Sequence, residues 1–344
     1  MTTYAQTFCT VRDLISDAQS PIADEARLFQ AIREACDYLQ KEIGWFVPVT
    51  LTRSFNGKDR DLLIVPSLIS VTTLVNAGTT LSAADYILKP EDGHWAYGPY
   101  GEIEIDPDSN VLLGWVDETD GVVITGKWGL YNRTAPLTAT VADTTQQDAS
   151  QLTLKLSNAG EASPGMVLLV GSEQELVTGW STPIASATQL NGAITNSDEI
   201  LTVDDASLVN IGELVRIDFE QMLVKDRNTT TNKLYVMRGY NNTARAAHLD
   251  NATLDVYRTV TVERGVNGTT AATHANGLAI SRYLAPDDVQ MLSKQIATLL
   301  VNKAKSGYQG RTGNADTGVV LYHDAFPRYD IDRIKECYAL PRFA

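Results

Sequence analysis

The stretch RGVNGTTAATH, residues 264–274, decides how the centre of this chain is interpreted, because it repeats an earlier pattern. The earlier copy is RGYNNTARAAH, residues 238–248, which lies 26 positions upstream and shares its Arg-Gly, Asn, Thr, Ala and His positions. Similarity at a fixed spacing within one chain indicates a duplicated structural unit. We therefore expect two copies of one module around these segments.

A second repeat lies just upstream, with a spacing of 47 residues. Residues 214–218 and 233–236, next to the repeated positions, alternate between apolar and polar side chains, which is typical of strands. The pattern predicts one or two β-sandwich or barrel-like units over roughly residues 137–283. Residues 134–150, which are rich in Thr, Ala, Gln, Asp and Ser, have the composition of a linker. The repeated positions are Leu154, Gly165, Glu173, Gln174 and Val177, matched by Leu201, Gly212, Glu220, Gln221 and Val224.

The charged positions of the 26-residue repeat are Arg238 and His248 in one copy and Arg264 and His274 in the other. Neither histidine has a second histidine or a cysteine at the local spacing of a transition-metal site. Because both histidines end the same short unit, we expect them to stabilise a turn by hydrogen bonding. Metal binding and acid–base catalysis are the alternatives.

The two ends of the chain have helical patterns. Thr10 and Asp13 resemble a capping box before a helix over residues 11–18, and apolar residues recur at helical spacing from residue 20 to Gly44. Helical periodicity returns at Pro286, and a short final helix is expected over residues 330–340.

Between the first helices and residue 132 the pattern changes to short strands. Residues 47–55 alternate, Asn56-Gly57 is a strong hairpin-turn signal, and further strands are expected at 62–65, 71–76, 86–88, 102–105 and 121–128. The predicted fold class is thus α+β, a helical core with an antiparallel β part, into which an all-β sandwich or barrel-like module is inserted. The predicted domains are a discontinuous core, residues 1–136 and 284–344, and the insert, residues 137–283.

Composition limits the classes of function. The chain has 344 residues, 44% of them hydrophobic, which is enough for about two domains. Its formal charge of −14 argues against a general binder of nucleic acids or membrane surfaces, since both require a basic face. Cys9, Cys36 and Cys337 lie far apart and are expected to be free thiols in a reducing cytoplasm. No apolar run approaches the length of a membrane anchor.

The sequence contains no cluster that predicts an enzyme. We expect no catalytic residues, no cofactor and no metal site. Acidic pairs such as Asp204-Asp205, or Glu173 with Glu175, leave open a hydrolase role, because paired carboxylates can cleave glycosides. A calcium site on the Asp-rich turns is the other alternative.

Several segments at the two ends, taken in order, resemble the head-to-tail adaptor, or head-completion, family of tailed phages. The resemblance covers residues 10–132 and 284–344, and the middle resembles repeats found in other phage structural proteins. The segments that carry it are TVRDLIS (10–16), AIREACDYL (31–39), 49–57, ADYIL (84–88), 123–131 and FPRYDIDRIK (326–335).

This resemblance implies a non-enzymatic structural subunit of the virion neck, assembled in the host bacterial cytoplasm. Twelve copies would form a ring between the portal protein and the next neck or tail protein, with double-stranded DNA passing through the lumen without specific binding. The acidic balance suits such a channel, because a negatively charged wall does not hold DNA.

The resemblance also implies that the C-terminal segment docks on the portal. Aromatic and Arg residues there are typical anchors of interfaces. The alternative is an amphipathic end-helix that packs within its own chain. The implied docking residues are Phe326, Arg328, Tyr329, Arg333, Lys335, Tyr338, Arg342 and Phe343.

A different class of function remains open for the β insert. An adhesin or fibre-anchoring virion protein would use residues 137–283 to bind a host glycan or another structural protein. Deleting the insert would then abolish adsorption while leaving particle assembly intact.

Overall fold

The computed structural model describes residues 4–17, 24–95, 98–109, 114–143, 148–305, 311–314, 319–322 and 327–339. Over these residues the protein is mostly β, with three six-stranded antiparallel sheets, four α-helices and a two-stranded hairpin, at 40% strand and 20% helix. The expectation of an α+β fold with a helical adaptor core is therefore wrong. The ends of the chain supply only a thin helical layer, and the strands between them form whole sheets.

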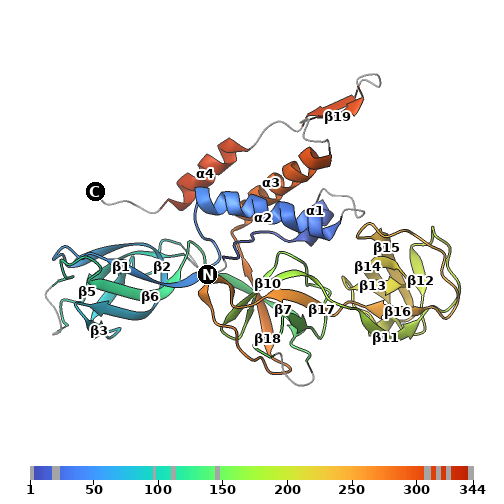
Figure 1. The fold of residues 1–344 in the computed structure, drawn as a ribbon, viewed down its shortest axis with the longest axis horizontal. Coiled ribbons are helices and arrows are strands. Elements are labelled where there is room, and N and C mark those ends of the chain that lie inside the picture. Colours follow the sequence, from blue (N-terminus) through green and yellow to red (C-terminus); the bar gives the residue numbers. More distant parts are fainter. Residues whose placement is uncertain are drawn as a thin grey trace.

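The helical layer lies on one side of the row of sheets (Figure 1). Asp24 caps the longest N-terminal helix by accepting a hydrogen bond from the backbone N–H of Ala26. One apolar stripe of that helix, which includes Leu28, Ile32 and Leu39, is fully buried against the other helices and the barrels. The four helices are α1 (Val11–Asp17), α2 (Glu25–Glu42), α3 (Asp287–Lys305) and α4 (Arg328–Tyr338).

The N-terminal sheet has the order β1-β6-β2-β5-β4, with β3 paired to β2. Because β1 pairs with β6, the hairpin predicted at Asn56-Gly57 is wrong. Gly57 is needed for a different reason: a Cβ at this position would collide with Trp115. The strands are β1 (Val49–Phe55), β2 (Leu62–Asn76), β3 (Thr79–Leu81), β4 (Tyr86–Lys89), β5 (Tyr100–Ile105) and β6 (Val122–Trp128).

A second sheet, which we call the first barrel, has the order β7-β18-β9-β10-β17-β8. A bridge between Val141 and Leu156 joins the chain after β7 to the chain after β8, and so closes the sheet on itself. The strands are β7 (Arg133–Thr140), β8 (Thr153–Lys155), β9 (Val167–Val170), β10 (Glu173–Trp180), β17 (Thr259–Glu263) and β18 (Ala279–Leu284).

The third sheet, which we call the second barrel, has the equivalent order β11-β16-β13-β14-β15-β12. A bridge between Leu190 and Val203 closes it in the same way. All of its strands lie in the chain between β10 and β17, so the second barrel is nested within the first. The strands are β11 (Ile184–Gln189), β12 (Ile200–Thr202), β13 (Leu214–Ile217), β14 (Glu220–Asn228), β15 (Lys233–Tyr240) and β16 (Thr253–Val256).

Nesting explains why the sequence has two repeat periods. Strands β8, β9 and β10 begin 47 positions before β12, β13 and β14, whereas β15 and β16 begin 26 positions before β17 and β18. Along the sequence, the first halves of the two barrels are thus 47 residues apart and the second halves are 26 residues apart. A single module, duplicated and inserted into itself, produces this pattern.

The linker expected at residues 134–150 is wrong over its first half. Residues 134–140 belong to β7, which pairs with β18, and residues 148–150 form a turn, while residues 144–147 lie outside the described residues. The Thr side chains of β7 lie at or near the barrel surface, while Ala139 is buried and Leu137 packs against the barrel core. Because the inward positions are mostly small Ala residues, the apolar alternation of this strand is weak.

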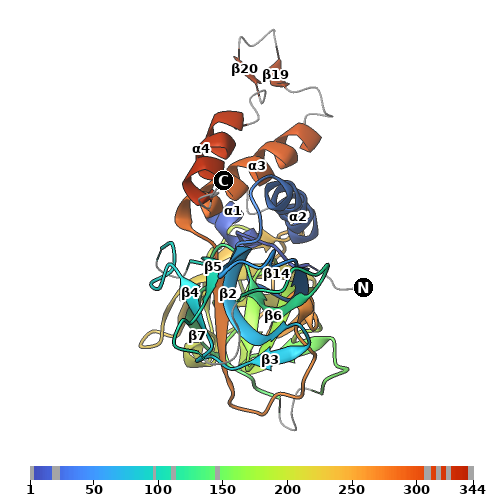
Figure 2. The same ribbon diagram turned by 90° about the vertical axis from the view of Figure 1, so that its left-hand side faces the viewer.

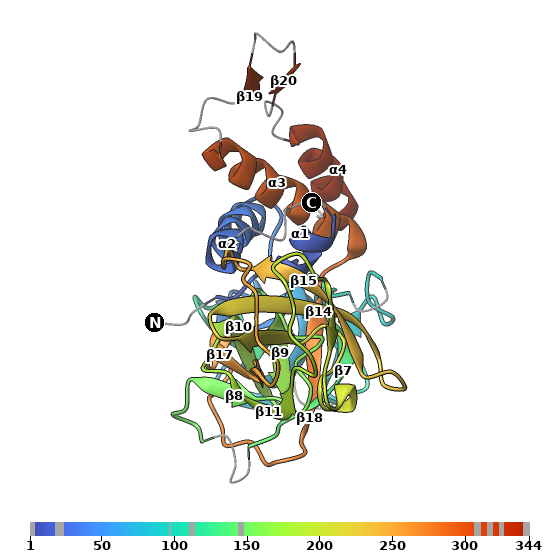
Figure 3. The same ribbon diagram turned by 90° about the vertical axis from the view of Figure 1, so that its right-hand side faces the viewer.

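The three sheets form a row, with the N-terminal sheet at one end and the second barrel at the other (Figure 1). The side views in Figures 2 and 3 show the helices as a separate layer over this row, with the β19 (Arg311–Asn314) and β20 (Val319–Tyr322) hairpin projecting beyond it. One apolar core joins the layer to both barrels, because it includes Leu176 of the first barrel and Tyr257, next to β16, of the second. In the described part of the chain, no helix is long and apolar enough to cross a membrane.

Candidate functional site

The second barrel contains a fully buried ion pair between Arg238 and Glu220. The guanidinium donates from Nε and Nη2 to the two carboxylate oxygens at 2.7 and 2.6 Å, which is the bidentate geometry that Arg favours. The remaining donors bind backbone carbonyls of Thr195, Asp198 and Ala246. Arg238 therefore holds the loop before β12 and the loop after β15 together.

Glu220 receives further hydrogen bonds from the loop that Arg238 anchors. The backbone N–H groups of Gly239 and Ala246 donate to it, and Nε2 of His248 lies 3.0 Å from Oε2. Burial alone would raise the pKa of this carboxyl, but the hydrogen bonds from Arg238, Ala246 and His248 outweigh it and lower the pKa to about 2. The carboxylate is thus the centre of the cluster.

The first barrel has the same cluster at the repeat-equivalent positions. Arg264 donates from Nε and Nη2 to Glu173 at 2.7 Å each, and Nε2 of His274 lies 2.9 Å from the same carboxylate. Burial would raise the pKa of Glu173, but the hydrogen bonds from Arg264 and the backbone lower it. Each Arg–His pair predicted to stabilise a turn therefore meets in space around a Glu that begins a strand in the other half of its barrel, β10 or β14.

A second buried carboxylate distinguishes the first barrel from the second. Glu175 is fully buried, and one of its oxygens lies 3.2 Å from Nε of Arg264 and 3.3 Å from Nε2 of His274. The second barrel has the apolar Met222 at the equivalent position. One guanidinium thus serves two carboxylates in the first barrel and one in the second.

Glu173, Glu175 and His274 offer ligand atoms that all lie within 4.8 Å of one another, a spacing that could hold a metal ion. The guanidinium of Arg264 is bonded to the same carboxylates. A positive charge in this place competes directly with a cation, so the arrangement fits an internal ion pair better than a metal site.

The repeated Asn of each barrel binds the backbone of another segment. Asn267 accepts a hydrogen bond from the N–H of Ala5 at 2.8 Å and donates to its carbonyl oxygen at 3.1 Å. Asn241 accepts from the N–H of Glu25, at the start of α2, at 3.0 Å. Both residues adopt positive φ of 55°, which Asn tolerates better than most residues do. The same motif thus attaches each barrel to a different part of the N-terminal segment.

Glu25 connects the helical layer to both barrels. Its carboxylate accepts hydrogen bonds from Tyr240 of the second barrel at 2.8 Å and from the indole N–H of Trp180 of the first barrel at 2.9 Å. Burial raises the pKa of Glu25 above its ordinary value and also raises that of the Tyr240 hydroxyl. This junction fixes the start of α2 where the two barrels meet.

Of the residues implied in portal docking, some are exposed, some pack within the chain, and some lie outside the described residues. Arg328, Tyr329 and Arg333 of α4 are exposed, and Tyr329 has 80% of its surface accessible. Lys335 instead pairs with Glu42, and Tyr338 packs edge-on against Phe46 and Trp95 and donates to Asp288. Phe326, Arg342 and Phe343 lie outside the described residues. Part of this helix thus packs within the chain, and the rest faces solvent.

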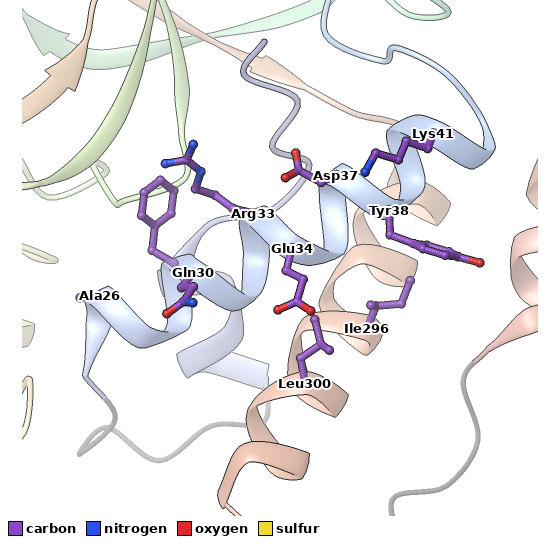
Figure 4. A pocket seen from close by; sticks show the side chains of 10 residues that line it. Ala26, Gln30, Arg33, Glu34, Asp37, Tyr38, Lys41, Ile296 and Leu300 are labelled. Carbon is purple, nitrogen blue, oxygen red and sulfur yellow. The ribbon is translucent and has the colours of Figure 1, made fainter. Parts of the chain in front are cut away.

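A groove of about 720 Å³ lies between α2 and α3. Its floor is apolar, with Phe29, Ile296 and Leu300, and Tyr38 lies at its side. Figure 4 shows Glu34 pointing from α2 toward Leu300 on α3. A smaller hollow of about 240 Å³ shares Gln30, Glu34 and Leu300 with the groove and extends it along the helices.

Prediction from the sequence missed Glu173 and Glu220 as partners of the Arg–His pairs. The signal was present, because both are equivalent positions of the 47-residue repeat. The sequence did not show that a Glu of the 47-residue repeat contacts an Arg–His pair of the 26-residue repeat. That contact follows only once one barrel is known to be nested in the other.

Comparison with known proteins gives no relative: no family model, no curated protein and no solved structure matches this chain.

Proposed function

We propose that this protein is a structural subunit of a phage neck, which forms a ring between the portal and the next neck or tail component. The observation that carries the proposal is that the buried charged groups of each barrel bind one another and hold loops in place. Arg238 with Glu220 and Arg264 with Glu173 form clusters that hold loops in place and are closed to solvent. Such groups provide rigidity and leave the exposed helices and barrels as surfaces for assembly.

The packing of the chain ends is consistent with this proposal. α2, near the start, packs against α3, near the end, and α4 contacts both. The helical segments near the two ends therefore form one layer. One apolar core joins this layer to both barrels, which are also attached to the N-terminal segment through Asn241 and Asn267.

The exposed half of α4 is the part that we assign to the portal. Replacing Arg328 and Arg333 by Glu should weaken binding to the purified portal at least tenfold. Both side chains face solvent, and the substitutions reverse the charge that they present to the portal. The control is Asp332→Lys, at an exposed position of the same helix, which removes no basic anchor. Equal binding by the double variant and the wild-type chain would exclude this docking surface.

The function itself is tested in the particle. Mass spectrometry of purified particles should detect the chain, and low-resolution images with the chain labelled should place a ring of it directly beneath the portal. Its absence from particles, or a label elsewhere on the virion, would contradict the proposal.

A groove on the second barrel favours an adhesin as the alternative. The groove measures about 660 Å³ and includes Tyr235 together with Asp198, Glu199 and Lys225. An aromatic ring next to carboxylates suits a glycan, because sugars stack on rings and donate hydroxyl hydrogen bonds. In an adhesin, Y235A would abolish adsorption to host cells without changing particle yield. In a neck subunit, the same substitution would leave adsorption unchanged.

A further inference from the structure

The end of the second barrel carries two large apolar side chains that have no cover. Phe219 has 94% of its surface exposed and Leu249 has 81%. They lie at the same end of the barrel, because each follows one member of a bonded pair: Asp218 and His248 are joined at 2.8 Å. We call Phe219 and Leu249 the knob.

The first barrel shows that the module does not require these residues. Its equivalent positions are Ser172 and Ala275, which are also exposed. The turn is otherwise alike, since Gly171 and Asp218 both adopt positive φ, at 62° and 52°. The apolar knob is thus an addition to the second barrel, and solvent-exposed apolar groups of this size indicate an interaction site.

The knob is held rigidly. The backbone of His248 exchanges hydrogen bonds with Ile194 at 2.9 and 3.0 Å, and Asp250, the residue after Leu249, accepts a hydrogen bond from the N–H of Gly192. Rigid groups lose little entropy on binding, so an anchor fixed in this way favours association.

The groove between α2 and α3 is complementary to the knob. Its floor is apolar, and with the adjoining hollow it carries four basic side chains and two acidic ones, in a chain whose net charge is −14. The knob is flanked by the acidic Asp218 and Asp250, both exposed. The basic residues are Arg27, Arg33, Lys41 and Lys303, of which Arg33 lies 3.4 Å from Glu263, and the acidic ones are Glu34 and Asp37.

We infer that the knob of one copy inserts into the α2/α3 groove of the next copy, an inference that rests on the proposed ring. Within one copy the knob is almost fully exposed, so it does not fill the groove of its own chain. A contact between two different surfaces of the same molecule is heterologous, and such a contact builds a ring where its rotation closes after a whole number of copies. The knob is then the anchor of a larger interface.

Sedimentation velocity of the purified chain, over a range of concentrations, tests the contact. The wild-type chain should associate beyond a dimer, and the variant F219S/L249A should associate at least tenfold more weakly, as expected for loss of a buried aromatic anchor. This variant carries the residues of the first barrel at both positions, so the fold should persist. The control L152S removes an apolar side chain that is 66% exposed on the first barrel, and it should leave association unchanged.

A mixing experiment shows whether the contact is heterologous. The groove variant Y38E keeps its knob, and F219S/L249A keeps its groove, so neither should assemble alone. An equal mixture should stop at the dimer, because each dimer contains one intact knob and one intact groove. Knob-to-knob contact would instead let Y38E dimerise on its own, and the mixture would contain Y38E dimers beside monomers of F219S/L249A.

Two results would overturn the inference: a wild-type chain that stays monomeric at high concentration, or a knob variant that assembles as the wild type does. These outcomes differ from failure of the proposed function. A chain that assembles through the knob but is absent from particles contradicts the neck function alone. A chain found in the neck whose assembly ignores the knob contradicts the contact alone.

Discussion

The first and second barrels have the same strand order and the same Arg–Glu–His cluster, yet they differ in what surrounds these parts. The first barrel lies in the middle of the row (Figure 1). It carries a second buried carboxylate, Glu175, and has the small residues Ser172 and Ala275 at the positions of the knob. The second barrel lies at the end of the row, has Met222 in place of that carboxylate, and carries the knob. The shared cluster thus maintains the module, while the exposed turn beside it is free to acquire a role in assembly.

The largest expected effect is the loss of the carboxylate in the second barrel. E220Q would leave the guanidinium of Arg238 buried without a counter-charge and should cost about 3–5 kcal/mol of unfolding free energy. E173Q should cost less, because Glu175 remains 3.2 Å from Arg264. Urea denaturation, with hydrogen exchange to assign each barrel, measures both. Equal losses would show that Glu175 does not compensate.

The pH dependence of stability tests the buried carboxylate of the second barrel. The pKa of Glu220 is lowered to about 2 in the folded chain, so the unfolded chain binds the proton more readily. Its contribution to stability is therefore complete above pH of about 4.5 and is lost as the pH falls from there toward 2. Denaturation of the second barrel between pH 6 and 3 should show this loss, and E220Q should remove it. A wild-type profile that is flat over this range would contradict the assignment.

Removing the repeated Asn should have a medium effect that differs between the barrels. N267A removes hydrogen bonds to both backbone groups of Ala5 at a fully buried position, and should cost about 2–3 kcal/mol. N241A loses the bond to Glu25 at a partly exposed position, and should cost about 1 kcal/mol. Hydrogen exchange should increase at residues 4–10 in the first variant and at the start of α2 in the second. A larger loss of unfolding free energy in N241A than in N267A would show that burial does not decide the strength of the two attachments.

The smallest effect is expected from exchanging the second carboxylate. E175M gives the first barrel the residue of the second, and should raise the unfolding free energy by about 1 kcal/mol, because a buried charge is removed while Glu173 still binds Arg264. The reverse change, M222E, should destabilise the second barrel. Thermal unfolding of both variants checks the pair, and a destabilised E175M would mean that Arg264 needs both carboxylates.

Prediction from the sequence succeeded where a pattern is local. The helices at the chain ends followed from their apolar spacing, and the repeats identified Arg238, His248, Arg264 and His274 as equivalent positions. It failed where partners are distant in the chain. β1 pairs with β6 and not with the strand that follows it, and β7 carries only one large apolar residue, Leu137. For the same reason the fold class was wrong, since short strands of mixed pattern form three complete sheets.

The groove and the knob were beyond prediction for a different reason. Phe219 and Leu249 are single apolar residues in polar turns, and only the exposed fraction of each shows that neither is a core residue. The groove depends on the spacing of α2 and α3, which lie more than two hundred residues apart in the chain.

The nested arrangement provides the most direct test of the distinction between the barrels. The chain leaves the first barrel after Trp180 and returns at Thr259, and these points adjoin, because the N–H of Ser181 donates to the carbonyl of Thr259 at 2.9 Å. Residues 182–257 can therefore be replaced by a short Gly-Ser linker. The measurement is native mass spectrometry of this variant, with hydrogen exchange of the first barrel. We expect a monomer whose first barrel keeps its protection from hydrogen exchange. Rings that still form would show that the second barrel does not drive assembly, and a first barrel without protection would show that it cannot fold alone.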